Sequence, residues 1–129
     1  MDTTVIIVSY KSEHLIEQNI KSYDKNTKII IVENSQNQLL KNEIEKKYQN
    51  VEVILNKNCG FGQAANLGAK LAKTKNIFFC SPDNFSEKNT INKLENLSKE
   101  LKDKFGIDGL LRTMRDNEND PSVQERACW

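Results

Sequence analysis

The chain has 129 residues, of which 37% are hydrophobic, and this composition suits one globular unit that buries about two thirds of its unfolded surface. Its 19 basic and 18 acidic residues leave a formal net charge of +1, so no overall field favours nucleic acid or an anionic membrane as a partner. The three cysteines are odd in number and form no CxxC pair, which argues against a disulfide framework and a zinc site and fits a reducing cytosol.

Four short apolar runs predict β-strands, and amphipathic spacing after each run predicts a helix. The runs occupy residues 5–8, 28–32, 51–55 and 76–80. Apolar residues then recur at helical spacing over residues 16–23, 40–48, 61–72 and 91–101. The first apolar run is short and has no basic residues before it, so we expect neither a signal peptide nor a transmembrane segment.

This alternation predicts an α/β fold, a Rossmann-like open and mostly parallel sheet flanked by helices. Ligands of such sheets bind beyond the carboxyl ends of the strands. The segments at those positions are mostly polar or glycine, namely Ser9 to Lys11, Glu33 to Ser35, Asn56 to Phe61, and Ser81 to Asn84. Loops are polar in general because they are solvated, but four such segments together indicate a binding site.

The stretch NKNCGFGQAANLGAKLA, residues 56–72, raises the question of which phosphates a glycine-rich loop would receive. From Gly60 to Ala65 it fits the GxGxxA form of a dinucleotide fingerprint, and Asp83 lies 21 residues beyond Gly62, where a ribose-binding acid belongs. However, that fingerprint follows the first strand directly, whereas here four residues separate Gly60 from the third strand. A Rossmann oxidoreductase is therefore only the third most favoured of the functional hypotheses.

The segments VIIVSYKS, IIIVENS, NKNCGFGQAANLGAKLA and FFCSPDN occur in this order and together resemble family 2 glycosyltransferases of the GT-A fold, especially the rhamnosyltransferase-like branch. The resemblance covers about residues 4–84, so it implies an incomplete GT-A fold. It implies an inverting enzyme that transfers a sugar from a nucleoside-diphosphate sugar to a glycan or lipid-linked acceptor in cell-surface polysaccharide synthesis. The alternative is a truncated, non-catalytic nucleotide-binding module, because the residues match no acceptor-binding motif and we assign no general base.

The same resemblance implies the residues of the donor site. Ser9 and Tyr10 would line the base site, and Glu33, followed by Asn34, would accept hydrogen bonds from base or ribose. The glycine-rich segment beside the nucleotide would comprise Asn58, Gly60, Phe61, Gly62, Asn66 and Gly68. Asp83 would bind Mg²⁺ or Mn²⁺, which prefer oxygen ligands and would neutralise the departing nucleoside diphosphate.

Structural roles compete with ligand binding at three of these positions. Asn66 and Gly68 would let their helix pack tightly on the sheet, and Phe61 would be buried. Glu33 also stands where the family usually has aspartate, which leaves the preferred nucleoside open.

The C-terminal tail differs in composition from the rest of the chain. All 16 lysines lie at or before Lys104, whereas the three arginines are Arg112, Arg115 and Arg126. We therefore expect a nucleotide-sugar-binding α/β domain over residues 1–111 and an atypical tail over 112–129, either frameshifted or disordered, or the start of a segment under different constraints. We expect a cytoplasmic protein, with peripheral attachment to the inner face of the membrane left open.

Overall fold

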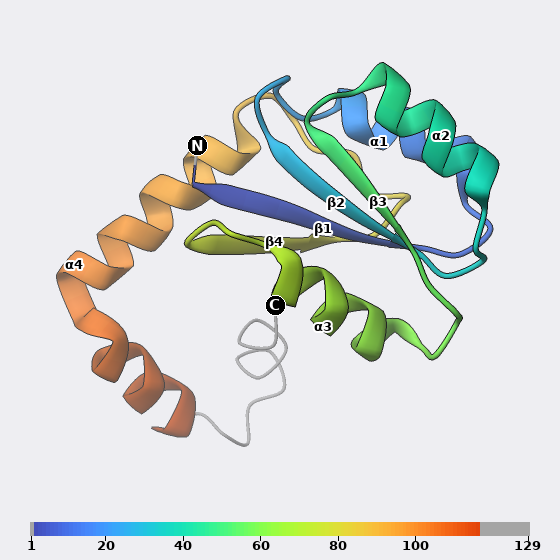
Figure 1. Ribbon diagram of the computed structural model, residues 1–129. Coiled ribbons are helices and arrows are strands. Elements are labelled where there is room, and N and C mark those ends of the chain that lie inside the picture. Colours follow the sequence, from blue (N-terminus) through green and yellow to red (C-terminus); the bar gives the residue numbers. More distant parts are fainter. Residues whose placement is uncertain (1, 117–129) are drawn as a thin grey trace. The chain divides into compact units, whose positions relative to one another are not determined.

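A computed structural model describes the backbone of residues 2–116 and the side chains as far as residue 104. Strands and helices alternate along it (Figure 1), in the order β1 Thr3–Ser9, α1 Glu13–Lys21, β2 Lys28–Glu33, α2 Gln38–Lys47, β3 Val51–Leu55, α3 Phe61–Leu71, β4 Asn76–Cys80 and α4 Thr90–Asp116. The predicted order of elements is confirmed.

The four strands form one parallel sheet in the order β3-β2-β1-β4. In the register, Val5 of β1 lies between Ile29 of β2 and Phe78 of β4. Along the chain, β2 is added beside β1 and β3 beside β2, whereas β4 is added on the other side of β1. This arrangement confirms the predicted α/β fold and puts the topological switch point between β1 and β4.

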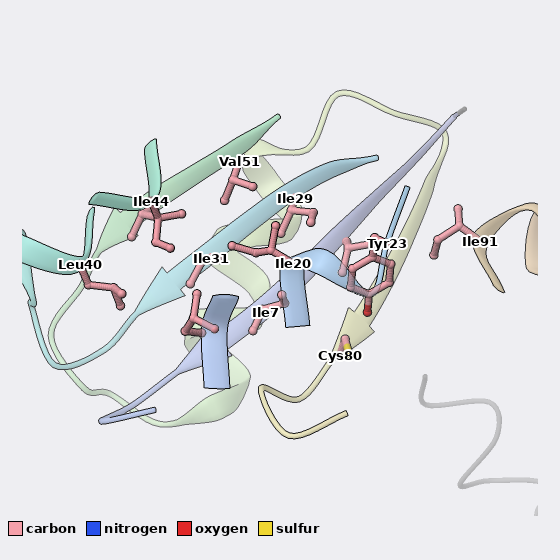
Figure 2. Close-up of a cluster of buried hydrophobic side chains, with 13 residues drawn as sticks. Ile7, Ile20, Tyr23, Ile29, Ile31, Leu40, Ile44, Val51, Cys80 and Ile91 are labelled. Carbon is pink, nitrogen blue, oxygen red and sulfur yellow. The ribbon is translucent and has the colours of Figure 1, made fainter. Parts of the chain in front are cut away.

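The two faces of the sheet bury different helices, because alternate strand residues point to opposite sides. On one face, Ile16 and Ile20 of α1 and Leu40 and Ile44 of α2 pack against the isoleucines and valines of β1, β2 and β3 (Figure 2). On the other face, Ala64 of α3 joins a smaller cluster formed by Ile6, Ile30 and Val32. The central strands β1 and β2 are therefore buried on both faces, as their continuous apolar runs predicted.

The chain divides into two compact units, Met1–Ile91 and Asn92–Trp129. The first contains the whole sheet and every site residue discussed below. Helix α4 runs without interruption through the predicted boundary after residue 111 as far as Asp116. The predicted division of the chain stays a prediction, and residues 117–129 of the atypical tail lie outside the described residues. Among residues that the structure describes, no helix is long and apolar enough to cross a membrane.

Candidate functional site

The carboxyl ends of β1, β2 and β3 are joined by backbone hydrogen bonds into one continuous surface. The amide nitrogen of Asn34 donates to the carbonyl oxygen of Ser9 at 2.7 Å, and that of Asn56 donates to the carbonyl oxygen of Glu33 at 2.9 Å. Beyond the strands, Ser35 and Lys57 form a further antiparallel bridge. Three of the four predicted segments thus lie together at one edge of the sheet.

Glu33 ends β2 as a fully buried carboxylate. One of its oxygens, Oε1, accepts hydrogen bonds from the hydroxyl of Ser35 at 2.5 Å and from its amide at 3.3 Å, and Oε2 accepts one from the amide of Asn37 at 2.7 Å. Asn37 in turn caps α2, because its Oδ1 accepts a hydrogen bond from the amide of Leu40 at 3.0 Å. Glu33 therefore shapes the loop between β2 and α2, and its predicted contact with base or ribose stays a prediction.

The residues predicted around the base differ in exposure. Ser9 is fully buried, and its hydroxyl has no hydrogen-bond partner among the described residues. Asn34 is also buried and accepts a hydrogen bond from the side chain of Asn56 at 3.0 Å. Tyr10 is 48% exposed, with the ammonium of Lys11 5.3 Å from its ring centroid. Of the three side chains, those of Ser9 and Asn34 are buried, and only that of Tyr10 is accessible to a ligand.

The first residues of the glycine-rich segment lie at the same edge of the sheet, because they follow the carboxyl end of β3. Gly60 has a φ of 92°, a left-handed conformation that favours glycine, and its amide donates to the side chain of Asn58 at 3.2 Å. The helix that follows has no side-chain cap at its N-terminus. Phe61, its first residue, is 60% exposed, so the interpretation of Phe61 as a buried residue is wrong.

The later residues of the segment lie on α3 itself. Asn66 is exposed, whereas Gly68 is buried between the helix and the sheet. A Cβ atom at Gly68 would lie 2.6 Å from Cγ2 of Ile6 and 3.3 Å from Cγ2 of Val32, whereas one at Gly62 would meet no atom within 4 Å. Close packing of α3 on the sheet therefore accounts for the glycine at position 68.

Asp83 occupies an exposed turn directly after β4. The amide of Asn84 closes this turn on the carbonyl oxygen of Ser81 at 3.1 Å, with Pro82 at the second position of the turn. Within the described part of the chain, the carboxylate of Asp83 has no hydrogen bond or ion pair, and no three His, Cys, Asp or Glu side chains gather as a metal site. A lone exposed carboxylate fits the way Mg²⁺ is held, with waters and substrate phosphates as the remaining ligands.

Two residues that the sequence did not point to hold this segment, Asn19 of α1 and Ser22, the residue that caps the C-terminus of α1. The side-chain amide of Asn19 donates to the carbonyl oxygens of Ser81 at 3.1 Å, Pro82 at 3.0 Å and Asn84 at 2.8 Å. The hydroxyl of Ser22 accepts a hydrogen bond from the amide of Ser86 at 3.0 Å. A signal for Asn19 was available, because it is a polar residue on the same helical stripe as Ile16 and Ile20.

A separate hollow of about 880 Å³ lies at the amino ends of the strands. Its lining includes Lys25, Lys28, Lys47 and Lys73. Lys47 is already paired with Glu17. Because ligands of open parallel sheets bind at the opposite, carboxyl edge, we do not assign the donor to this hollow.

The sheet order and the polar carboxyl edge define a doubly wound α/β domain of the ligand-binding type. A model of the family described as glycosyl transferase family 2 matches residues 4–125, and the chain belongs to that family. The predicted family is confirmed, while its rhamnosyltransferase-like branch stays a prediction.

Solved structures show the same fold. The crystal structure of S. aureus TarS 1–349 superimposes on this chain with a TM-score of 0.64. The sequence identity is 22%, and the match covers 78% of this chain and 33% of that one. For the complex of TarS 1–349 with UDP-GlcNAc the identity is 22% and the TM-score 0.66, over 78% of this chain and 32% of that one. For the complex of TarS 1–349 with UDP, the identity is 16% and the TM-score 0.56, over 80% of this chain and 32% of that one. The chain thus spans about a third of each of these structures, and no curated protein matches it.

Proposed function

We propose that this chain forms the donor-binding part of an inverting glycosyltransferase that uses a nucleoside-diphosphate sugar. One observation carries the proposal: the segments that resemble the family's donor site come from distant parts of the chain, yet follow neighbouring strands at the switch point of the sheet. In particular, the segment with Ser9 and Tyr10 follows β1, and the turn with Asp83 follows β4, its neighbour in the sheet.

The nucleoside would lie against Tyr10, whose half-exposed ring offers a stacking surface. Glu33 and Asn34 would support it from the adjacent loop, together with the backbone of Ser9. The diphosphate would face the segment from Asn58 to Gly62, where the uncapped N-terminus of α3 leaves amide donors directed toward an anion. Because one similar structure is a complex with UDP-GlcNAc, a uridine diphosphate sugar is the first donor to test.

Asp83 would hold Mg²⁺ or Mn²⁺ against the donor diphosphate. Its exposure and its lack of protein partners among the described residues support this assignment. A divalent cation bound there would neutralise charge on the departing nucleoside diphosphate. The family resemblance supports a glycan or lipid-linked acceptor in cell-surface polysaccharide synthesis. The cysteine content supports a cytoplasmic location, with peripheral attachment to the inner face of the membrane left open.

The proposal is tested by the melting temperature of the chain with UDP, with and without Mn²⁺. A ligand that binds only the folded state stabilises it by about 2.7 kcal/mol at a concentration 100 times its Kd, so the melting temperature should rise when both are present. Asp83→Ala should remove the Mn²⁺-dependent part of the rise. Asp24→Ala, an exposed aspartate that precedes β2 at the opposite edge, is the matched control and should keep it. An unchanged melting temperature for the unsubstituted chain would overturn the donor-site proposal.

Hydrolysis separates an enzyme from a non-catalytic binding module. If the chain releases the sugar from UDP-GlcNAc and Asp83→Ala abolishes the release, the module is ruled out. Binding without any release would favour the module.

A further inference from the structure

We propose that Asn19 is a positioning residue that fixes the turn carrying Asp83, and that it thereby sets how strongly a divalent cation and the donor diphosphate bind together. The inference rests on the proposed role of Asp83 and extends it to a residue on another element. Asn19 lies 64 residues earlier in the chain, on α1, and is fully buried.

A single nitrogen atom of Asn19, Nδ2, makes all of its side-chain hydrogen bonds to the turn. A side-chain amide has two N–H donors, yet three carbonyl oxygens lie 2.8 to 3.1 Å from Nδ2, so at least one hydrogen is shared. The opposite orientation of the amide would bring its oxygen against the same three oxygens. The network therefore fixes which end of the amide faces the turn.

These bonds determine the direction of the turn. The carbonyl oxygens of Ser81, Pro82 and Asn84 are all directed at α1, and the thiol of buried Cys80 also approaches the carbonyl oxygen of Asn84, at 3.4 Å. Asp83 is the one residue of the turn whose carbonyl oxygen does not bond to Asn19, and its side chain is exposed. Because the backbone on both sides of Asp83 is held, its carboxylate is presented to solvent from a fixed position.

Ser22 extends the same attachment by one helical turn. Its hydroxyl donates to the carbonyl oxygen of Asn19 at 2.6 Å and accepts from the amide of Ser86 at 3.0 Å. The segment from Ser81 to Ser86 is thus attached at one end to Asn19 of α1 and at the other to Ser22, the C-cap residue of that helix. Residues that orient a metal ligand change metal affinity by about 10- to 100-fold when removed, although they never touch the ion.

The side chain of Asn19 acts in this network as a donor only. Its Oδ1 is buried and has no hydrogen-bond partner within the described residues. Asn19→Asp keeps the size of the side chain but turns acceptor oxygens toward three carbonyl oxygens. It should therefore release the turn at least as fully as Asn19→Ala does.

The first measurement is amide hydrogen exchange of the ligand-free chain. In Asn19→Ala and Asn19→Asp, the amides of residues 84–86 should exchange faster, while those of the central strands β1 and β2 stay protected. The matched control is Asn50→Ala, because the side chain of Asn50 also donates to a loop carbonyl, that of Thr27 at 2.7 Å, but at the opposite edge of the sheet. Unchanged exchange of residues 84–86 in both Asn19 variants would overturn the proposal.

The second measurement is the Kd of UDP by calorimetry, with Mn²⁺ and again with EDTA. The Kd of UDP in EDTA divided by its Kd with Mn²⁺ reports how much the cation strengthens nucleotide binding. We expect Asn19→Ala to reduce this ratio about tenfold or more while leaving the Kd in EDTA unchanged. Ser22→Ala, the milder variant should Asn19→Ala not fold, should reduce it in the same direction, and Asn50→Ala should not.

The outcomes separate this inference from the proposed function. If the unsubstituted chain shows no Mn²⁺-dependent UDP binding, the proposed function fails and the inference fails with it. If that binding is present and Asp83→Ala abolishes it, but folded Asn19 and Ser22 variants keep the full ratio, only the inference is overturned.

Discussion

A Cβ atom at Gly68 of α3 would lie 2.6 Å from Cγ2 of Ile6 in β1, closer than two carbon atoms can approach without one of them moving. The helix and the strand thus pack at a distance that only glycine permits. This contact positions α3, and with it the uncapped N-terminus at the carboxyl edge of the sheet.

Gly68→Ala should therefore destabilise the fold, by about 1–3 kcal/mol from overpacking of a well-packed contact. Urea unfolding followed by circular dichroism measures the change. Gly62→Ala is the control in the same helix, because its added Cβ would meet no atom within 4 Å. It should leave the midpoint unchanged or raise it, since alanine favours a helix more than glycine does. Equal midpoints for the two variants would contradict the account of this contact.

Glu33→Gln should destabilise the loop between β2 and α2. The substitution replaces one acceptor oxygen with an amide donor that faces either the donors of Ser35 or the amide of Asn37. We expect a loss of about 1–3 kcal/mol, the usual cost of leaving a buried polar group without a partner. Glu43→Gln, at an exposed glutamate of α2, should change the unfolding midpoint little. A Glu33 variant as stable as this control would show that the carboxylate does not organise the loop.

Stability in acid should depend on Glu17. Hydrogen bonds from the ammonium of Lys47 and the hydroxyl of Tyr48 lower the pKa of this carboxyl from 4.5 to about 2, with Lys21 adding a smaller electrostatic contribution. A lowered pKa in the folded state contributes stability that is fully present above pH 4.5 and is lost as the pH falls through 2.

Glu17→Gln should therefore reduce the dependence of the melting temperature on pH in the window from 4.5 to 2. At neutral pH it should be less stable than the unsubstituted chain, and the two should converge in acid. Glu87→Gln, at an exposed glutamate near the start of α4, serves as the control and should follow the unsubstituted chain. A difference between Glu17→Gln and the unsubstituted chain that is constant across the window would contradict the assigned hydrogen bonds.

The sequence predicted the layers of the fold well, because the central strands β1 and β2 contain continuous apolar runs and the helices between the strands have apolar stripes. Such patterns report burial on both faces of a parallel sheet directly. The polar strand ends likewise predicted which segments lie together, since the carboxyl ends of parallel strands meet at one edge, while their role as a donor site stays a prediction.

Side-chain roles that depend on distant neighbours could not be predicted in this way. Phe61 fits the apolar stripe of α3 but begins the helix, and the ends of that stripe are exposed, 60% at Phe61 and 41% at Leu71, while Ala64 in its middle is buried. Asn19 looks like an interruption of the stripe on α1 until β4 is placed beside β1. The three carbonyl oxygens that it binds come from residues more than 60 positions away.

Binding of the donor at the carboxyl edge of the sheet is tested most directly by the map of amide chemical-shift changes when UDP and Mg²⁺ are added to the ¹⁵N-labelled chain. Donor binding at this edge predicts changes in the amides of residues 9–11, 33–35, 58–62, 81, 83 and 84, and none in residues 25–28 or 49–50 around the lysine-lined hollow. Changes gathered around that hollow, or none at millimolar UDP, would contradict it.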